Sequence, residues 1–356
     1  MARALKLTRH GRETATPNPN VGCVIVKQGR IIGEGWHEKA GTGHAEVNAL
    51  NACTETPRGA TVYVTLEPCA HHGRTPPCAE ALIKAGVARV VAALEDPNPA
   101  VSGKGFAMLR AAGIQAESGL MADQARAVHR GFLSRMQRGR PWVTVKLGAS
   151  LDGRTALSNS ASRWITGAEA RRDVHALRAR SCAVLTGIGT VRADNPALTV
   201  RDVPCRRQPL RVLLDSRLEV ADDAAILQGG NTLLVTASGD ERRNAGLLAR
   251  GIEVIRVGVE AVKGKVDLEA MMRALAQRGI NELLVETGAK LNGSLLQAGV
   301  VDEIVVYVAP SVLGDAALGM FAIGVIDDLK DRVQLRFNEV RHVGADVRIT
   351  AMVMEK

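Results

Sequence analysis

Short apolar runs alternate along the chain with stretches in which apolar residues recur every three or four positions. The first pattern predicts buried strands and the second predicts amphipathic helices. A hairpin is expected over 21–36, where two β-branched runs flank a Lys-Gln-Gly-Arg turn. Strands are then predicted at 60–69 and 88–99, and helices at 44–53, 78–87 and 105–114. This alternation predicts an α/β sandwich with a partly parallel sheet.

The pattern restarts after a basic segment, 138–141, that carries a glycine and a proline, as linkers often do. A helix is predicted at 170–181. Strands are predicted at 141–150, 182–191, 210–217, 231–238, 252–258, 282–288, 303–314 and 346–356. With 356 residues, two domains are the default. We therefore expect two α/β domains, 1–140 and 141–356.

Composition changes this picture little but excludes several classes of protein. Hydrophobic residues make up 46% and charged residues 23% of the chain, which excludes a mainly disordered protein. Six cysteines are too few for a disulfide scaffold in a chain of this length. No apolar run approaches the ~20 residues of a membrane span, and the first residues turn polar too soon for a signal peptide. A cytoplasmic protein is the simplest expectation.

The charge of the chain indicates the kind of ligand. Lys and Arg number 46 against 37 Asp and Glu, a formal net charge of +9, which favours anionic ligands. Only 3% of the residues are aromatic, whereas proteins that bind single-stranded nucleic acid stack bases on aromatic side chains. Small phosphorylated molecules are therefore favoured over nucleic acid. A surplus of charge that serves only solubility remains the alternative.

The strongest chemical signal combines His44, Glu46, Cys69 and Cys78. One imidazole and two thiolates suit zinc, and three protein ligands leave a fourth position for water, as in catalytic sites. Glu46 has a separate role, because a carboxylate beside the metal can carry protons between water and substrate. We expect His44 at the very start of a helix, where both side chains can face one pocket. This order of residues is typical of zinc nucleobase deaminases.

One feature departs from that signature, since eight residues rather than two separate Cys69 from Cys78. His71 and His72, within this insert, could compete as zinc ligands. We interpret them, with Arg74, as the polar wall of a substrate pocket and its phosphate contact. Solvated loop residues are the alternative interpretation.

The second half has weaker signals. It contains no GxGxxG, and the nearest string, at 187–192, lacks the third glycine, so a Rossmann domain is not predicted. The segment 286–294 contains a Gly-bearing turn between an apolar run and a helical stretch. Backbone N–H groups in such a turn suit phosphate, although a plain structural turn would give the same pattern.

Taken together, these strings resemble a known family. PNPNVGCVIV (17–26), HAEVNAL (44–50) and EPCAHHGRTPPC (67–78) look like the deaminase half of the RibD family, the bifunctional deaminase/reductases of riboflavin biosynthesis, in which the longer insert is normal. The segments 145–156, 162–167, 170–179, 187–201, 214–216 and 283–296 look like successive motifs of the family's reductase domain. The resemblance implies a cytidine-deaminase-like α/β/α sandwich followed by a dihydrofolate-reductase-like α/β domain that uses NADPH.

The resemblance also implies site residues by motif position. In the first domain these are the zinc ligands His44, Cys69 and Cys78, with Glu46 catalytic, and substrate contacts from Asn20, His71 and Arg74. In the second domain the implied substrate contacts are Ser162, Arg178, Leu198, Arg201 and Glu286, with Lys146 nearby. The implied cofactor contacts are Gly148, Trp164, Thr190, Asp194, Ser216, Gly288, Ala289, Lys290, Leu291, Asn292, Gly293 and Ser294. Alternatively, Leu198 belongs to the core, Arg178 is a solvated helix charge and Asn20 only forms a turn.

The implied activity has two steps. The first is zinc-dependent hydrolytic deamination of 2,5-diamino-6-ribosylamino-4(3H)-pyrimidinone 5′-phosphate. The second is NADPH-dependent reduction of the ribosyl group, which gives 5-amino-6-(5-phosphoribitylamino)uracil. The resemblance further implies a homo-oligomer. Three alternatives remain open: a nucleic-acid base deaminase with an appended domain, a non-catalytic module with a closed structural zinc site, and a chain with only one active half.

Overall fold

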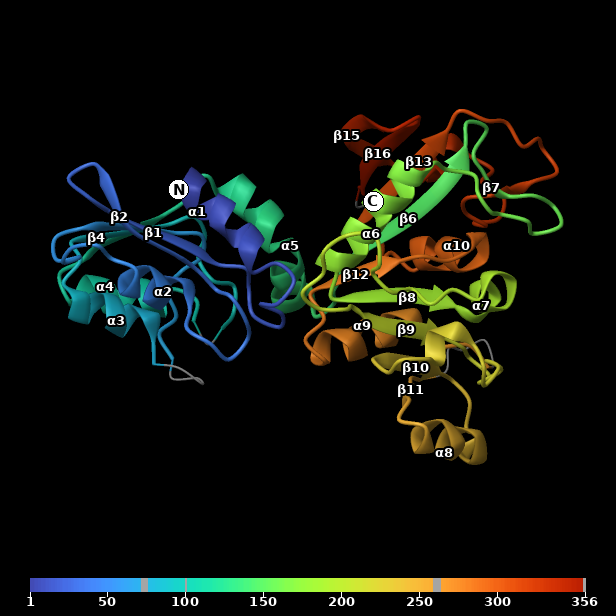
Figure 1. Cartoon of the computed structure of the whole chain (residues 1–356), viewed down its shortest axis with the longest axis horizontal. Helices are drawn as coiled ribbons and strands as arrows, with labels where there is room; N and C mark the ends of the chain where they lie inside the picture. Colours follow the sequence, from blue (N-terminus) through green and yellow to red (C-terminus); the bar gives the residue numbers. More distant parts are fainter. Residues whose placement is uncertain (72–75, 100, 259–263, 355–356) are drawn as a thin grey trace. The chain divides into compact units, whose positions relative to one another are not determined.

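The computed structural model describes residues 1–71, 76–99, 101–258 and 264–354. The chain divides into two compact units, Met1–Arg140 and Pro141–Lys356, called here the N-terminal and C-terminal units (Figure 1). No helix among the described residues is long and apolar enough to cross a membrane.

The N-terminal unit is built on a five-stranded sheet in the order β2-β1-β3-β4-β5. The strands are β1 (Gly22–Lys27), β2 (Arg30–Trp36), β3 (Thr61–Val64), β4 (Arg89–Ala92) and β5 (Gln115–Ser118). The predicted hairpin is confirmed, because β1 and β2 pair antiparallel. Its turn places Gln28 and Gly29 at positive φ, as two-residue hairpin turns require. β3, β4 and β5 run parallel, so the expected partly parallel sheet is also present.

Helices cover both faces of this sheet. They are α1 (Ala2–Leu7), α2 (Ala45–Asn51), α3 (Cys78–Ala85), α4 (Lys104–Ala111) and α5 (Ala122–Arg138). Figure 1 shows α2, α3 and α4 together on one side, and their apolar residues pack in one core with those of the strands. α1 and α5 contribute to separate apolar clusters. The result is an α/β/α sandwich.

Close approach of α2 to strand β2 depends on two glycines. A Cβ at Gly35 would lie 2.3 Å from the backbone nitrogen of Ala49, and one at Gly33 would lie 2.4 Å from its carbonyl oxygen. Only glycine therefore lets the helix lie directly on the strand. This contact fixes the N-terminus of α2, which His44 precedes in an extended conformation.

The C-terminal unit contains a nine-stranded sheet in the order β11-β10-β9-β8-β12-β6-β13-β16-β15. Its strands are β6 (Trp142–Ser150), β8 (Ala183–Gly187), β9 (Leu210–Leu214), β10 (Thr232–Thr236), β11 (Glu253–Arg256), β12 (Glu282–Val285), β13 (Glu303–Ala309), β15 (Leu335–Val343) and β16 (Asp346–Val353). Seven strands run parallel, and β16 and β15 add an antiparallel hairpin at one edge. β7 (Arg154–Ala156) and β14 (Leu318–Gly319) form a small separate pair.

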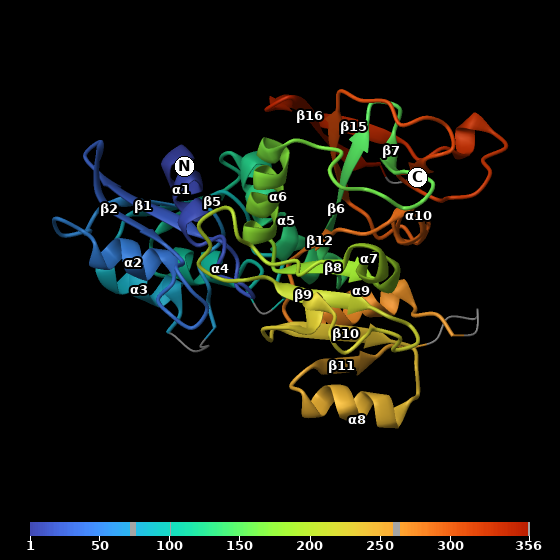
Figure 2. The ribbon, with the colours of Figure 1, turned by 45° about the vertical axis from the view of Figure 1, so that its right-hand side comes forward.

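Two apolar cores lie on the two faces of this larger sheet. One contains residues of α9 (Leu268–Gln277) and α10 (Ala289–Gln297). The other contains residues of α6 (Ala168–Arg180), α7 (Ile188–Asp194) and α8 (Glu241–Ala249). Figure 2 shows β9, β10 and β11 side by side, with α8 beyond them. The carboxyl ends of the parallel strands lead into α7 and α10, and open α/β sheets bind ligands at such ends.

Candidate functional site

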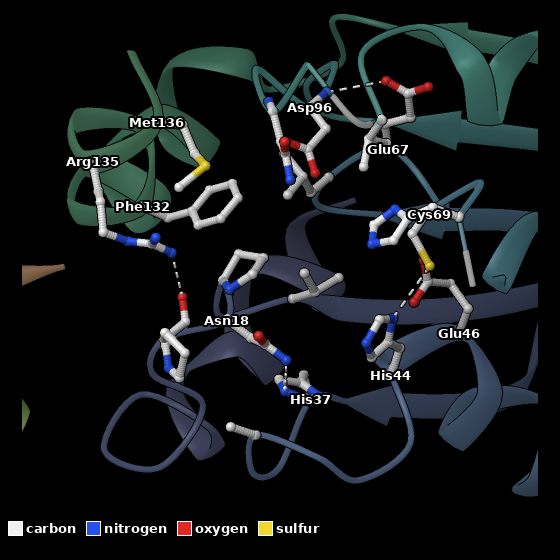
Figure 3. Close-up of a pocket in the computed structure, with 18 of the residues that line it drawn as sticks. Asn18, His37, His44, Glu46, Glu67, Cys69, Asp96, Phe132, Arg135 and Met136 are labelled. Carbon is white, nitrogen blue, oxygen red and sulfur yellow. Dashed lines mark hydrogen bonds between the residues drawn. The ribbon is translucent and has the colours of Figure 1, made fainter. Parts of the chain in front are cut away.

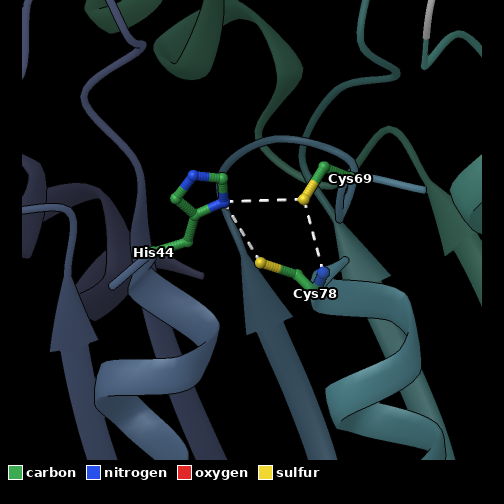
Figure 4. Close-up of side chains that lie close together, drawn as sticks. All are labelled: His44, Cys69 and Cys78. Carbon is green, nitrogen blue, oxygen red and sulfur yellow. Dashed lines mark hydrogen bonds between the residues drawn. The ribbon is translucent and has the colours of Figure 1, made fainter. Parts of the chain in front are cut away.

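Three side chains from separate segments converge in the N-terminal unit (Figure 4). His44 precedes α2, Cys69 lies in the loop after β3, and Cys78 is the first residue of α3. The Nδ1 atom of His44 lies 3.2 Å from the Sγ atom of Cys78 and 3.5 Å from that of Cys69. Ligand atoms around a tetrahedral zinc are ~3.6 Å apart for bonds of ~2.0 Å to nitrogen and ~2.3 Å to sulfur. The donor set and its spacing therefore fit a zinc ion.

The protonation of this cluster is linked to its geometry. The hydrogen bond with Cys78, and then that with His44, lowers the pKa of the Cys69 thiol to about 4. The same contact and burial raise the pKa of Cys78. The backbone N–H of Cys78 also donates to the Sγ atom of Cys69 at 3.3 Å. Metal binding at such a site releases the remaining thiol proton.

Glu46 lies in the first turn of α2, two residues beyond His44. Its side chain is buried, and burial followed by the charge of Cys69 raises its pKa to about 7. A carboxyl group with this pKa can both accept and return a proton near neutral pH. The ligand cluster found among the described residues consists of His44, Cys69 and Cys78, and Glu46 lies outside it.

A cavity of about 490 Å³ opens beside these groups (Figure 3), a size typical of small-molecule sites. His44, Glu46 and Cys69 lie on its wall. The other polar residues that line it include Asn18, His37, Thr42, His71, Asp96, Asn98 and Arg135. Val21, Leu66, Val101, Phe132 and Met136 give it apolar surface. A flat ring with polar edges suits such a mixed lining.

His37 links the metal cluster to the opposite wall. Its Nδ1 atom lies 3.2 Å from the carbonyl oxygen of Gly43, and its Nε2 atom lies 3.1 Å from Nδ2 of Asn18. Burial lowers the pKa of His37 and favours the neutral ring, in which Nδ1–H donates to Gly43 and Nε2 accepts from Asn18. The ring also meets that of His44 edge-on, with centroids 5.2 Å apart. His37 therefore orients both Asn18 and a metal ligand.

Of the three substrate contacts predicted for this unit, one lines the cavity, one does not, and one lies outside the described residues. His71 lines the cavity. Asn20 does not; Asn18, two residues earlier in the same Pro-Asn-Pro-Asn turn, takes that position. His72 and Arg74 lie outside the described residues. Sequence reasoning missed Asn18, His37 and Asp96, although the repeated asparagine made Asn18 an equal candidate.

In the C-terminal unit, Glu286 is the centre of a buried ion cluster at the end of β12. Its carboxylate accepts from Nε and Nη2 of Arg178 at 2.5 and 2.9 Å, and Nζ of Lys146 lies 2.9 Å away. Burial raises the pKa of Glu286, but the charges of Arg178 and Lys146 outweigh it and hold that pKa well below its usual range. Arg178 also donates to the carbonyl of Thr199. Arg178 is thus a buried, paired residue and not a solvated helix charge.

Several other predicted residues meet in pairs near the same strand ends. The hydroxyl of Ser162 donates to Asp194 at 3.1 Å. The hydroxyl of Thr190 lies 3.3 Å from that of Thr287, which joins α7 to the turn before α10. Ser216 follows β9 and accepts from the backbone of Val266. Gly148 is on β6, and Arg201 and Trp164 are exposed.

Three predicted contacts lie in the interior instead. Asn292 is fully buried and donates to the carbonyls of Thr287 and Met320. A Cβ at its neighbour Gly293 would lie 2.2 Å from the carbonyl oxygen of Ala322, so this glycine faces the same segment. Both residues hold α10 against the segment that contains Met320 and Ala322. The side chain of Leu198 is buried in the core, which leaves its backbone, at φ +54°, for any contact.

Family models match both parts of the chain. The model of the RibD C-terminal domain matches residues 141–349. The model of the cytidine and deoxycytidylate deaminase zinc-binding region matches residues 1–94. The deaminase model includes the His44, Cys69 and Cys78 cluster, and the RibD C-terminal model includes the Glu286 ion cluster.

Relatives of similar length match both units together. The riboflavin biosynthesis protein RibD of Escherichia coli K12 is 50% identical, covering 98% of this chain and 96% of that protein. The RibD protein of Bacillus amyloliquefaciens is 42% identical over 99% of this chain and 95% of its own. The structure of RibD from Acinetobacter baumannii has a TM-score of 0.91 at 42% identity, covering 99% of this chain and 98% of that one. A deaminase/reductase from Thermotoga maritima has a TM-score of 0.87 at 32% identity, with 99% and 97% covered.

Proposed function

Since the chain belongs to the RibD family, we propose that its N-terminal unit carries the deaminase site and its C-terminal unit the reductase site. The chain is a bifunctional deaminase and reductase of riboflavin biosynthesis that uses zinc and NADPH, with a cytidine-deaminase-like and a dihydrofolate-reductase-like fold. Its substrate is a small phosphorylated pyrimidine. The observation that carries the assignment is the convergence of His44, Cys69 and Cys78 beside Glu46 on one cavity.

We infer the individual substrate from the T. maritima relative, which is described as a diaminohydroxyphosphoribosylaminopyrimidine deaminase and 5-amino-6-(5-phosphoribosylamino)uracil reductase. The same two reactions in this chain start from 2,5-diamino-6-ribosylamino-4(3H)-pyrimidinone 5′-phosphate and end at 5-amino-6-(5-phosphoribitylamino)uracil. The net positive charge and the size of the cavity support a ligand of this kind. Six cysteines outside disulfide bonds and the use of NADPH support a cytoplasmic location.

In the first reaction, water replaces the 2-amino group of the pyrimidine and ammonia leaves. A zinc ion held by His44, Cys69 and Cys78 would lower the pKa of a water molecule beside it to ~7. Glu46, buried in the first turn of α2 beside this cluster, accepts a proton from the attacking water and returns it to the departing amine. Asn18, held by His37, offers its amide to the ring edge.

In the second reaction, a bound NADPH would supply the hydride that reduces C1′ of the sugar, and with a proton from solvent the ribosyl group would open to ribityl. The backbone N–H groups at the start of α10, from Gly288 to Leu291, suit a cofactor phosphate, and Thr190 and Asp194 lie on the neighbouring helix. Glu286 fixes the positions of Lys146 and Arg178 at the substrate side. Arg201 is exposed, and its guanidinium group can bind the ribose phosphate. Positioning of the hydride donor close to the sugar C1′ supplies much of the rate enhancement of the reduction.

The open alternatives are weakened by these observations. A nucleic-acid base deaminase with an unrelated appended domain conflicts with relatives that match nearly the whole chain. A non-catalytic module conflicts with the T. maritima relative, which is described as a deaminase and reductase and matches 99% of this chain.

A mass-spectrometric product assay tests the proposed function. Zinc-loaded protein is given the freshly prepared diaminopyrimidine ribosyl phosphate with and without NADPH. We expect an amine replaced by oxygen without NADPH, and two further hydrogens in its presence. No change in mass with zinc bound would overturn the substrate assignment.

The variant Glu46→Gln tests the proton carrier. We expect deamination to fall by about 10²–10⁴-fold, because the amide cannot accept the proton of water. Zinc content and reduction of the deaminated intermediate should match those of the wild type. The same exchange at the exposed Glu38 is the control. Normal deamination by Glu46→Gln would show that another group carries the proton.

The variant Arg201→Ala tests the phosphate contact of the reductase. Loss of one charged hydrogen bond should raise the reductase KM by about 10- to 100-fold and leave deamination unchanged. Arg201 suits this test better than Arg178, since truncation of a buried ion pair destabilises the fold. Arg172→Ala, an exposed arginine on α6, is the control. A parallel loss of deamination would indicate misfolding instead.

We also propose that the chain forms a homo-oligomer, as the family resemblance implies, through the outer hairpin of the C-terminal unit. Leu335, Phe337 and Val340 on β15 pair with Val353, Ala351 and Ile349 on β16. Directly paired residues share a face, so the exposed Leu335, Phe337 and Val340 form one apolar surface with the half-buried Ile349 and Val353, whereas Ala351 on the same face is buried. Phe337 is 69% exposed and Val340 59%. An apolar patch of this kind is self-complementary and can be covered by its copy across a twofold axis.

Phe337→Asp should disrupt this association, because it places a charge in the apolar surface. Light scattering after size exclusion should then give the monomer mass of 37.8 kDa, against a multiple of it for the wild type. Leu248→Asp, at an exposed leucine on α8, should leave the oligomer intact. A wild-type chain that is monomeric at micromolar concentration would contradict the proposal.

A further inference from the structure

Glu67 is a buried carboxylate that the proposed reaction does not use. Its Oε1 atom accepts from the backbone N–H groups of Gly105 and Phe106, at 2.9 and 3.2 Å. Its Oε2 atom accepts from those of Gly103 and Asp96, at 3.0 and 3.1 Å. Only 4% of the residue is exposed. One side chain thus satisfies four backbone donors, including those at the start of α4, where a negative charge is favoured.

These bonds join α4 to the loop that carries a zinc ligand. Glu67 lies two residues before Cys69, and its own N–H donates to the carbonyl of Leu94 at 2.9 Å. A Cβ at Gly105 would lie 2.0 Å from the carbonyl oxygen of Pro68, so the first turn of α4 rests directly on this loop. The position of the Cys69 loop is therefore fixed from both sides.

The same network continues into the wall of the cavity. The carboxylate of Asp96 accepts from the N–H of Asn98 at 2.8 Å, and the carbonyl of Asn98 accepts from the N–H of Val101 at 2.8 Å. Asp96, Asn98 and Val101 all line the cavity. Figure 3 shows the bond from the backbone of Asp96 to Glu67 on the side of the cavity away from Asn18. Asp96 is thus tied to Glu67 directly, Asn98 through Asp96, and Val101 through Asn98 and Asp96.

We propose that Glu67 is a positioning residue for deamination: it sets the distance between the zinc-ligand loop and the polar wall formed by Asp96 and Asn98. This role rests on the proposed deaminase function of the cavity. A carboxylate is needed because all four partners are donors. An amide of the same shape would turn its own NH₂ group toward two of them and leave those buried N–H groups without an acceptor.

The isosteric variant Glu67→Gln tests this role in the full-length, zinc-loaded protein. We expect the deaminase KM to rise by at least about 10-fold, since small displacements of positioning groups are costly, with a smaller change in kcat. Zinc content and reductase kinetics should equal those of the wild type. Hydrogen exchange should become faster at the amides of Gly103, Gly105 and Phe106. Glu95→Gln, the same exchange at an exposed carboxylate of the neighbouring loop, should change none of these quantities.

Gly105→Ala provides a second variant that retains the carboxylate: its Cβ would push α4 away from Pro68 and would lie 3.1 Å from Oε1 of Glu67. It should reproduce the rise in deaminase KM. The proposal is overturned if Glu67→Gln has faster exchange but normal deaminase KM and kcat, or if zinc, both activities and stability are lost together, which would indicate a scaffold role only. Failure of the wild type itself to deaminate would overturn the proposed function instead, so the two failures are distinguishable.

Discussion

The N-terminal unit depends on holding two sulfur atoms and an imidazole within 4.8 Å of one another. Without a cation, two thiolates at this distance repel, and the opposite pKa directions of Cys69 and Cys78 show that only one of them ionises easily. Zinc removes this restriction and takes both as thiolates. Metal binding is therefore coupled to the folding of the three segments that carry His44, Cys69 and Cys78. The hydrogen bonds of His37 and Glu67 hold two of these segments in place.

The two units use buried carboxylates in opposite ways. Burial, followed by the charge of Cys69, raises the pKa of Glu46 to about 7, so it is suited to exchange a proton. Glu286 is equally buried, but Arg178 and Lys146 keep it ionised, so it is suited to hold cations in place. The difference follows from the sign of the neighbouring charges. Sequence position alone does not distinguish these two glutamates.

Sequence reasoning predicted the strands and the motif residues, which follow from sequence patterns. It missed cavity residues that are brought together only by tertiary contacts. The hairpin, the parallel strands and the His44, Cys69 and Cys78 set follow from local patterns, and the structure brings the three side chains together. His37 and Asp96 come from loops whose meeting depends on packing between distant segments, such as that imposed by Glu67. The sequence also did not reveal that Asn292 is fully buried, because the direction of its side chain depends on how α10 packs against the segment that contains Met320.

The outer hairpin shows a further limit of pattern reading. With strict alternation, Leu335 and Phe337 would share one face of β15, and Val340 would lie on the other. The pairing with β16 shifts register between Phe337 and Glu339, which inserts one extra residue. This bulge brings Val340 onto the same face as the other two. The apolar surface is thus a product of backbone geometry, and a period-two analysis of the sequence divides it between two faces. A surface that arises in this way requires the strand register to be known before its residues can be recognised as one group.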